Sequence, residues 1–148
     1  MMRRALDLAR AAADADEAPV GAVVYETETG RLLGEGRNRR ESDADPTAHA
    51  EILALRAAAR VVGNWRLSDC TLVVTLEPCA MCAGAVVNAR VGRLVIGALD
   101  PKAGATHSLY SLCDDPRLNH RVEAITGVRA DEAGRLLREF FRNKRRPP

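Results

Sequence analysis

Two apolar runs without polar alternation, residues 71–76 and 94–98, constrain the fold of this chain more than any other feature. The segment between them opens at Pro78, has a helix-like composition and ends at Gly92. Strands of this kind are buried on both faces, so helices must cover both sides of their sheet. The order strand, helix, strand implies a right-handed parallel crossover. The sequence therefore predicts an α/β fold.

The remaining segments also alternate between helix-like and strand-like patterns. A turn separates residues 20–25 from residues 32–36, and both runs are strand-like, which predicts a hairpin. Residues 38–46 and 100–107 are expected to form loops. The other predicted elements are helices over residues 1–13, from 46 or 47 to 62, over 108–113 and over 131–142, and a last strand over residues 122–125.

Apolar positions predict which sides of two of these helices are buried. In the helix that ends at residue 62, the spacing of one buried face is followed by Ile52, Leu55, Ala59 and Val62. The last helix has four large apolar side chains with which to dock, namely Leu136, Leu137, Phe140 and Phe141.

The composition is typical of a globular protein. The chain has 148 residues, of which 47% are apolar and 28% charged, and this length suffices for one core. We therefore expect a single domain over residues 1–148. No apolar run approaches membrane-spanning length, and acidic residues interrupt any signal-like start, so we expect a cytoplasmic protein without membrane contact.

Only two of the four cysteines, Cys79 and Cys82, have the spacing of metal ligands. In a cytoplasmic protein such a pair more often binds metal or does redox work than forms a structural disulfide. Cys70 opens an apolar run and Cys113 follows a leucine. We expect these last two to be buried as small apolar residues.

The net charge of +2 neither requires nor excludes an anionic partner. Basic residues nevertheless gather near the C-terminal end. They could contact a phosphate backbone or form a solvated, solubilising end, and both interpretations stay open. The residues concerned are Arg138, Arg142, Lys144, Arg145 and Arg146.

Four residues together predict a catalytic zinc site. Cys79 and Cys82 fall at a predicted helix N-terminus and His49 at or near another, where the helix dipole favours thiolates. Three protein ligands leave a fourth position open, as in catalytic zinc sites. Two thiolates and a neutral imidazole cancel the charge of Zn²⁺, which makes it a weaker Lewis acid, so a base is needed to take a proton from water. Glu51, two residues after the histidine, is the candidate base.

Each of these residues alone has a simpler interpretation. The cysteine pair could be a redox pair or half of a structural zinc site, but no second Cys-x-x-Cys exists to complete such a site. A thioredoxin-like pair would follow the first strand. His49 could be a capping or core residue, and Glu51 an ordinary first-turn acid. The four residues in combination favour the catalytic zinc site.

The pattern His-x-Glu followed by Pro-Cys-x-x-Cys is the signature of zinc nucleobase deaminases. Beyond this signature, most of the chain resembles the bacterial tRNA adenosine deaminase family. The segments that carry the resemblance are residues 18–23, 38–39, 45–51, 64–67, 75–85 and 119–122, together with Phe140-Phe141-Arg142.

This resemblance implies a three-layer α/β/α cytidine-deaminase-like fold with a mixed five-stranded sheet. It also implies a homodimer that converts the wobble adenosine of a tRNA anticodon loop to inosine. One Zn²⁺ per subunit would be bound by His49, Cys79 and Cys82. Glu51 would take a proton from the water at the metal, pass it to N1 of adenine and later assist the departure of ammonia, while hydroxide attacks C6.

The resemblance further implies a set of substrate contacts. Asn38 and the backbone at Ala48 would hydrogen-bond the flipped base, and Val20 and Leu76 would pack against it. An anticodon loop is single-stranded, so its bases can enter pockets without melting a duplex. The remaining residues expected to bind the RNA are Asp100, Asn119, His120, Arg121 and Arg142.

The chain departs from the family pattern in a loop expected to approach the RNA. Leu99 stands where the family commonly has an arginine, and His107 precedes Ser108 where a glycine is common. We expect His107 to be a surface residue rather than an extra ligand. Two other functions remain open: a deaminase of a free base or nucleoside, of guanine or cytosine type, on the same zinc core, and an RNA-binding protein that keeps zinc for folding.

Overall fold

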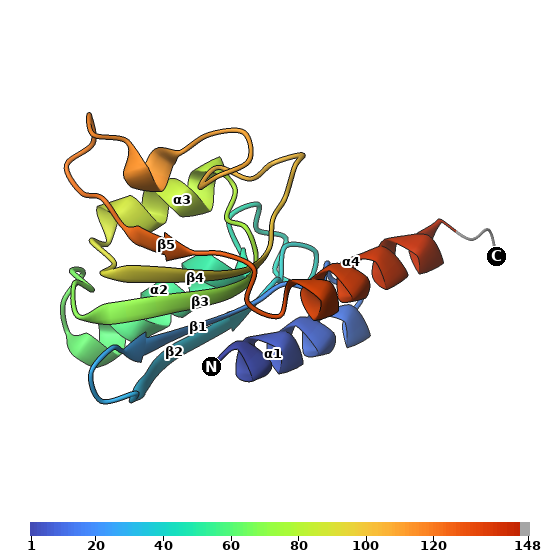
Figure 1. The fold of residues 1–148 in the computed structure, drawn as a ribbon. Coiled ribbons are helices and arrows are strands. Elements are labelled where there is room, and N and C mark those ends of the chain that lie inside the picture. The colour runs from blue at the N-terminus through green and yellow to red at the C-terminus, as the bar shows by residue number, and fades with distance from the viewer. Residues whose placement is uncertain (146–148) are drawn as a thin grey trace.

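A mixed sheet of five strands, in the order β2-β1-β3-β4-β5, lies between two layers of helices (Figure 1). The computed structural model describes residues 1–145. The strands are β1 (Gly21–Glu26), β2 (Leu32–Arg37), β3 (Cys70–Leu76), β4 (Arg93–Ala98) and β5 (Glu123–Ile125). The helices are α1 (Met2–Asp14), α2 (Ala50–Val62), α3 (Ala80–Asn88), the short 3₁₀ helix η1 (Leu112–Asp114) and α4 (Ala130–Lys144).

The strand pairing explains why the sheet is mixed. β1 pairs antiparallel with both β2 and β3. β3 then pairs parallel with β4, which pairs parallel with β5. Helix α3 forms the connection between β3 and β4. The predicted hairpin and the predicted parallel unit are both confirmed, and so is the three-layer arrangement.

The core lies on both faces of the sheet. On one face α2 and α3 cover a large cluster that includes Val24, Leu72, Val74, Leu94 and Ile96. On the other face α1 and α4 lie side by side (Figure 1) and cover a smaller cluster built from Met2, Leu6, Val23, Val73 and Ala133. β3 is buried on both faces, as its apolar run predicts.

The predicted buried face of α2 is wrong. Of its four residues only Leu55 is buried, because Ile52 and Ala59 are half-buried and Val62 is 41% exposed. The helix instead turns its small residues toward the sheet, namely Ala50, Ala54 and Ala58. The reason lies in β2, where Gly34 and Gly36 let the helix backbone approach the strand directly.

Because α2 approaches β2 so closely, adding one methyl group at Gly36 should lower the stability of the fold considerably. A Cβ at Gly36 would lie 2.1 Å from the carbonyl oxygen of Ala50 and 2.8 Å from the nitrogen of Ala54, so backbone must move. We expect Gly36→Ala to lower the free energy of unfolding by about 2 kcal/mol or more, measured by urea denaturation. Gly84→Ala is the matched control, because nothing lies within 4 Å of a Cβ there. An equally stable Gly36→Ala would contradict the packing described.

Several predicted helix boundaries differ from the structure, including those of α3, which covers Ala80–Asn88 within the predicted segment from Pro78 to Gly92. Asp45 accepts hydrogen bonds from the backbone and hydroxyl of Thr47, and this local turn delays the start of α2 to Ala50. The helix predicted over residues 108–113 is only η1. Helix α4 runs longer than predicted but projects past the sheet (Figure 1), so Phe141 is 46% exposed.

The side chains of α4 dock less completely than the sequence suggests. Ala133 is its one buried residue, and Leu136, Leu137 and Phe140 are half-buried. Arg146, part of the basic C-terminal group, lies outside the described residues. None of the described helices is both long and apolar enough to cross a membrane.

Candidate metal centre

The three predicted ligands come together where two helices begin. His49 is the N-cap residue of α2 and Cys79 that of α3, and both have extended backbone. Cys82 follows in the first turn of α3 and is fully buried. Nδ1 of His49 lies 3.6 Å from Sγ of Cys79 and 3.5 Å from Sγ of Cys82. Among residues 1–145, this is the group of donors close enough to hold a metal ion.

These separations suit zinc. Zn–N bonds of about 2.0 Å and Zn–S bonds of about 2.3 Å at tetrahedral angles place nitrogen and sulfur about 3.5 Å apart. Both observed N···S separations match this value. The His, Cys, Cys donor set is also one that zinc accepts, with a fourth position left for water or substrate.

The ionisation of the two cysteine side chains also favours the binding of a cation. Hydrogen bonds with Cys82 and His49 lower the pKa of the Cys79 thiol to about 3. The hydrogen bond between His49 and Cys79 raises the pKa of the histidine. The hydrogen bond between Cys82 and Cys79, together with burial, strongly raises the pKa of the Cys82 thiol. The protein alone therefore stabilises one thiolate. A second one requires a positive ion, as metal binding supplies.

Glu51 lies in the first turn of α2, two residues after His49, and is 3% exposed. Burial raises the pKa of its carboxyl group to about 7, and the nearby His49 only partly offsets this effect. A carboxyl group with such a pKa can both accept and donate a proton near neutrality, which general acid–base catalysis requires.

A pocket of about 180 Å³ opens beside this group. It brings together seven of the residues predicted from the sequence: Val20, Asn38, His49, Glu51, Leu76, Cys79 and Asp100. Asn38 is buried, and its side-chain amide donates to the carbonyl of Ala18 at 3.3 Å. Ala48 is buried next to His49 but does not line the pocket.

The other residues predicted to bind the RNA lie outside this pocket. His120 donates from Nε2 to the carbonyl of Val91 at 2.8 Å, near the start of β4 rather than its end. Arg121 pairs with Asp114 at 2.6 Å, and Asn119 is exposed beside it. Arg142 is exposed on α4. None of the four predicted residues lines the pocket of this chain.

Two charged residues that line the pocket were not among the site residues predicted from the sequence. Arg40 lines the pocket and is exposed, so it lies on the rim. Its position just after Asn38-Arg39 is the feature of the sequence that could have indicated a role at the site. Glu77 is 2% exposed. Burial tends to raise its pKa, but hydrogen bonds from Ser108 and from backbone N–H groups outweigh this and lower it to about 2. The feature of the sequence that could have indicated a role for Glu77 is its charge directly after the apolar strand β3.

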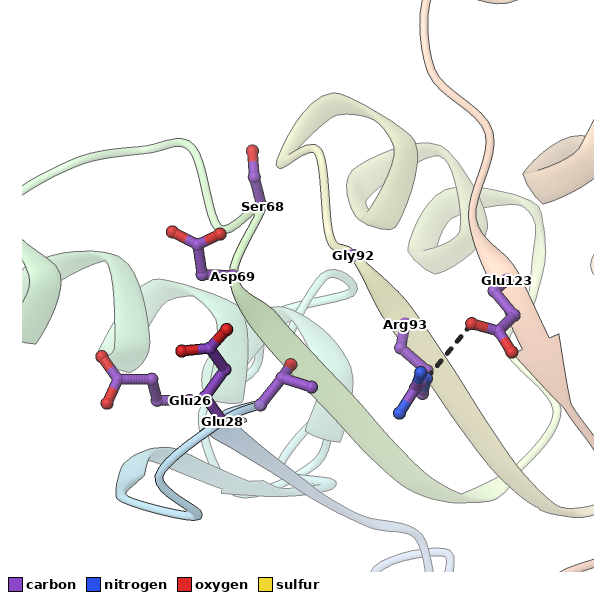
Figure 2. Close-up of a pocket in the computed structure, with 8 residues that line it drawn as sticks. Glu26, Glu28, Ser68, Asp69, Gly92, Arg93 and Glu123 are labelled. Atoms are coloured by element: carbon purple, nitrogen blue, oxygen red, sulfur yellow. Dashed lines mark hydrogen bonds and ion pairs between the residues drawn. The ribbon is translucent and has the colours of Figure 1, made fainter.

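A larger cavity, of about 460 Å³, lies at the opposite end of the strands (Figure 2). Its charged groups are mainly carboxylates, from Glu26, Glu28, Asp69 and Glu123, and Arg93 pairs with the last of these at 3.2 Å. Such a surface repels phosphate and contains no thiol or imidazole. The chemistry of this chain is therefore centred on the smaller pocket.

The fold and the site are those of a deaminase whose His, Cys, Cys group can hold a metal ion. The sequence matches the MafB19-like deaminase family over residues 1–145. The tRNA-specific adenosine deaminase of Haemophilus influenzae is 48% identical over 145 residues, which make up 98% of this chain and 83% of that protein. That of Bacillus subtilis is 43% identical, with 98% and 89% covered. The chain belongs to this family of deaminases, which are hydrolases.

Solved structures support the same fold. A tRNA:A34 deaminase structure, from work on A-to-I editing at the wobble position of transfer RNA, has a TM-score of 0.87 and 41% identity, with 92% of this chain and 97% of that chain covered. A guanine deaminase from Nitrosomonas europaea has a TM-score of 0.82 and 33% identity, with 94% and 81% covered. The predicted cytidine-deaminase-like fold is confirmed.

A third kind of relative is a longer protein. The tRNA(Ile)-lysidine synthase of Deinococcus radiodurans is 52% identical over 145 residues, which are 98% of this chain but only 25% of that protein.

Proposed function

We propose that this chain is a zinc-dependent enzyme that deaminates the wobble adenosine of a tRNA anticodon to inosine. The observation that carries the proposal is the buried Glu51, which interacts with the His49, Cys79 and Cys82 group and lines the same small pocket. A structural zinc site has no use for a buried base at the metal, so the alternative of a non-catalytic RNA-binding protein is disfavoured.

The size of the pocket suits a single flipped base. Its 180 Å³ is smaller than the cavities of about 300–1,000 Å³ that hold drug-sized ligands. Val20 and Leu76 provide apolar contact for the faces of a base, and Asn38 provides a polar group at its edge. Enzymes that act on a nucleobase read it in this way after taking it out of the stack.

In the proposed reaction, Glu51 moves the protons. When bound, zinc supplies the Lewis acidity that makes water a nucleophile near neutral pH. Glu51 removes a proton from this water and delivers it to N1 of adenine. Water oxygen becomes attached to C6, the C6–N6 bond breaks, and ammonia leaves with the second proton that Glu51 transfers. The product is hypoxanthine, the base of inosine.

The tRNA substrate is supported by the relatives of similar length, which are tRNA-specific adenosine deaminases. Arg40 on the pocket rim is a reasonable phosphate contact, and so is Arg142 on α4. An enzyme with this substrate would work in the cytoplasm. Asn119, His120 and Arg121 lie away from the pocket, so any RNA contact of theirs would be outside the base-binding site or would involve another subunit.

An apolar surface supports the proposed homodimer. A groove between α2 and α3 is lined mainly by apolar residues, including Ile52, Leu55 and Trp65. Trp65, which lines this groove, is 53% exposed. Burying such a patch against a second copy would remove it from water. Light scattering should give the mass of two chains, and the mass of one chain would contradict this part of the proposal.

The main competing function is deamination of a free base, since the guanine deaminase of Nitrosomonas europaea shares the fold. Turnover should be compared on an anticodon stem-loop with adenosine at the wobble position, on the same RNA with cytidine there, and on free guanine and cytosine. We expect turnover only of the adenosine RNA. Efficient turnover of guanine without turnover of the RNA would replace the proposal by the competing one.

A further inference from the structure

The carboxylate of Glu77 lies at the end of β3, two residues before the ligand Cys79, and points into the loop of residues 100–108. Its Oε1 accepts hydrogen bonds from the backbone N–H groups of His107 at 2.7 Å and Ser108 at 2.8 Å. Its Oε2 accepts one from the backbone N–H of Asp100 at 2.8 Å. Both ends of the loop are therefore joined to one carboxylate.

Three further donors complete the arrangement. The backbone N–H and the hydroxyl group of Thr106 each lie 3.3 Å from Oε1, and the hydroxyl of Ser108 donates to Oε2. A carboxylate has about four lone-pair positions. Six donors occupy all of them, so Glu77 has no free acceptor for a substrate, although it lines the pocket.

The loop is folded tightly around this carboxylate. A Cβ at Gly104 would lie 2.2 Å from both Cδ and Oε2 of Glu77, so only glycine fits there. The N–H of Gly104 donates to the carbonyl of Asp100 at 2.8 Å, and that of Ala105 to the carbonyl of Pro78 at 2.8 Å. The loop is thereby closed on itself and attached to the segment that carries the cysteines.

The same loop forms one wall of the pocket. Asp100 and Ala103 both line it, opposite residues from the segment that contains Asn38. Leu99, which precedes the loop, and His107 within it, where the chain departs from the family pattern, are both exposed, and His107 bonds to Glu77 through its backbone N–H. The internal hydrogen bonds therefore set the backbone of the wall, while the outer side chains are free to vary.

We infer that Glu77 is a positioning residue for RNA binding: it holds the loop of residues 100–108 so that Asp100 and Ala103 form the wall of the base pocket. This inference rests on the proposed function, because RNA is taken as the ligand of that wall. Glu77 acts through the loop and does not touch the reacting atoms.

Glu77→Gln tests the inference, because an amide places an NH₂ group opposite donors that need an acceptor. We expect KM for the adenosine stem-loop to rise by about tenfold or more, with kcat within about threefold of wild type. Zinc content should stay at one per chain. Without RNA, hydrogen exchange should become faster at the backbone N–H groups of residues 100 and 106–108, and should not change in β3. Glu123→Gln, at the exposed first residue of β5, at the other end of the strands from the pocket, should match wild type in each of these measurements.

A second variant keeps the carboxylate and removes two donors. Thr106→Val combined with Ser108→Ala should give a smaller rise in KM and faster exchange in the same loop, and it serves as the test if Glu77→Gln does not fold. Unchanged loop exchange and unchanged KM would overturn the inference, and so would loss of zinc and kcat at constant KM, which would place Glu77 in the metal centre. Wild-type protein that is inactive on the stem-loop would instead refute the proposed function, and the exchange data would be unaffected.

Discussion

Glu51→Gln is expected to abolish deamination while the protein stays folded and keeps its zinc. Glutamine has nearly the same size and fills the same buried position, but it cannot accept a proton from water. Proton transfer by a positioned group contributes about 10²–10⁴-fold to rate, so kcat should fall by at least this factor. Metal analysis should still find one zinc per chain, because the three ligands are untouched.

The matched control for this variant is Glu28→Gln, an exposed glutamate beside the acidic cavity at the other end of the strands. It should retain the activity, the zinc and the melting temperature of the wild type. A Glu51→Gln variant with more than about a tenth of wild-type kcat would rule out the proton transfer assigned to this residue.

Cys82→Ala is expected to lose zinc and stability together. Cys82 lies in the first turn of α3 and is fully buried. Removing it leaves two protein ligands and one less compensating negative charge, so zinc content should fall well below one per chain. Because bound metal stabilises the folded state by mass action, loss of a tightly held ion should cost several kcal/mol of unfolding free energy, about 4 kcal/mol at a thousandfold excess over Kd.

Cys113→Ala is the control that distinguishes the loss of a metal ligand from the loss of a buried side chain. Cys113 is 1% exposed and lies in the large core cluster under α2 and α3, and it is no part of the group of possible metal ligands. The same substitution there should keep zinc at one per chain and cost only about 1 kcal/mol, an ordinary effect for a buried side chain. If Cys82→Ala retained full zinc content, or if both variants lost stability equally, Cys82 would not be a metal ligand.

The central part of the fold could be predicted from the sequence because its signals are local. The apolar runs at β3 and β4 have no polar alternation, and the helix predicted to open at Pro78 is α3, which begins two residues later at Ala80. The ligand group could also be predicted, since His49, Cys79 and Cys82 are residue types with specific chemistry at the starts of helices. Their 3.5–3.6 Å spacing required the structure.

The errors arose where distant segments decide the outcome. The buried face of α2 depends on the glycines of β2, which favour alanines such as Ala54 over larger residues such as Ile52. The role of Glu77 depends on a loop more than 20 residues away in sequence. The position of His120 near Val91 likewise follows from the path of the chain after η1. Periodicity contains no information on such contacts.

The resemblance to both tRNA and guanine deaminases shows why the fold alone does not determine the substrate. In the proposed reaction, zinc and Glu51 determine the reaction type, whereas the pocket walls and the surrounding surface select the nucleobase. In this chain those walls are formed by Val20, Asn38, Leu76 and the loop around Glu77. Identity to the tRNA-specific enzymes, at 48% for Haemophilus influenzae, exceeds the 33% to the guanine deaminase.

The most direct test of the central claim is to locate inosine in an RNA product. Zinc-loaded protein should be incubated with an anticodon stem-loop whose loop contains one adenosine, at the wobble position, and with a second RNA in which that adenosine is moved to the neighbouring position. Mass spectrometry of nuclease fragments should find inosine only in the first RNA, with one ammonia released per inosine. Inosine in neither RNA, from a protein with one zinc per chain, would contradict the account.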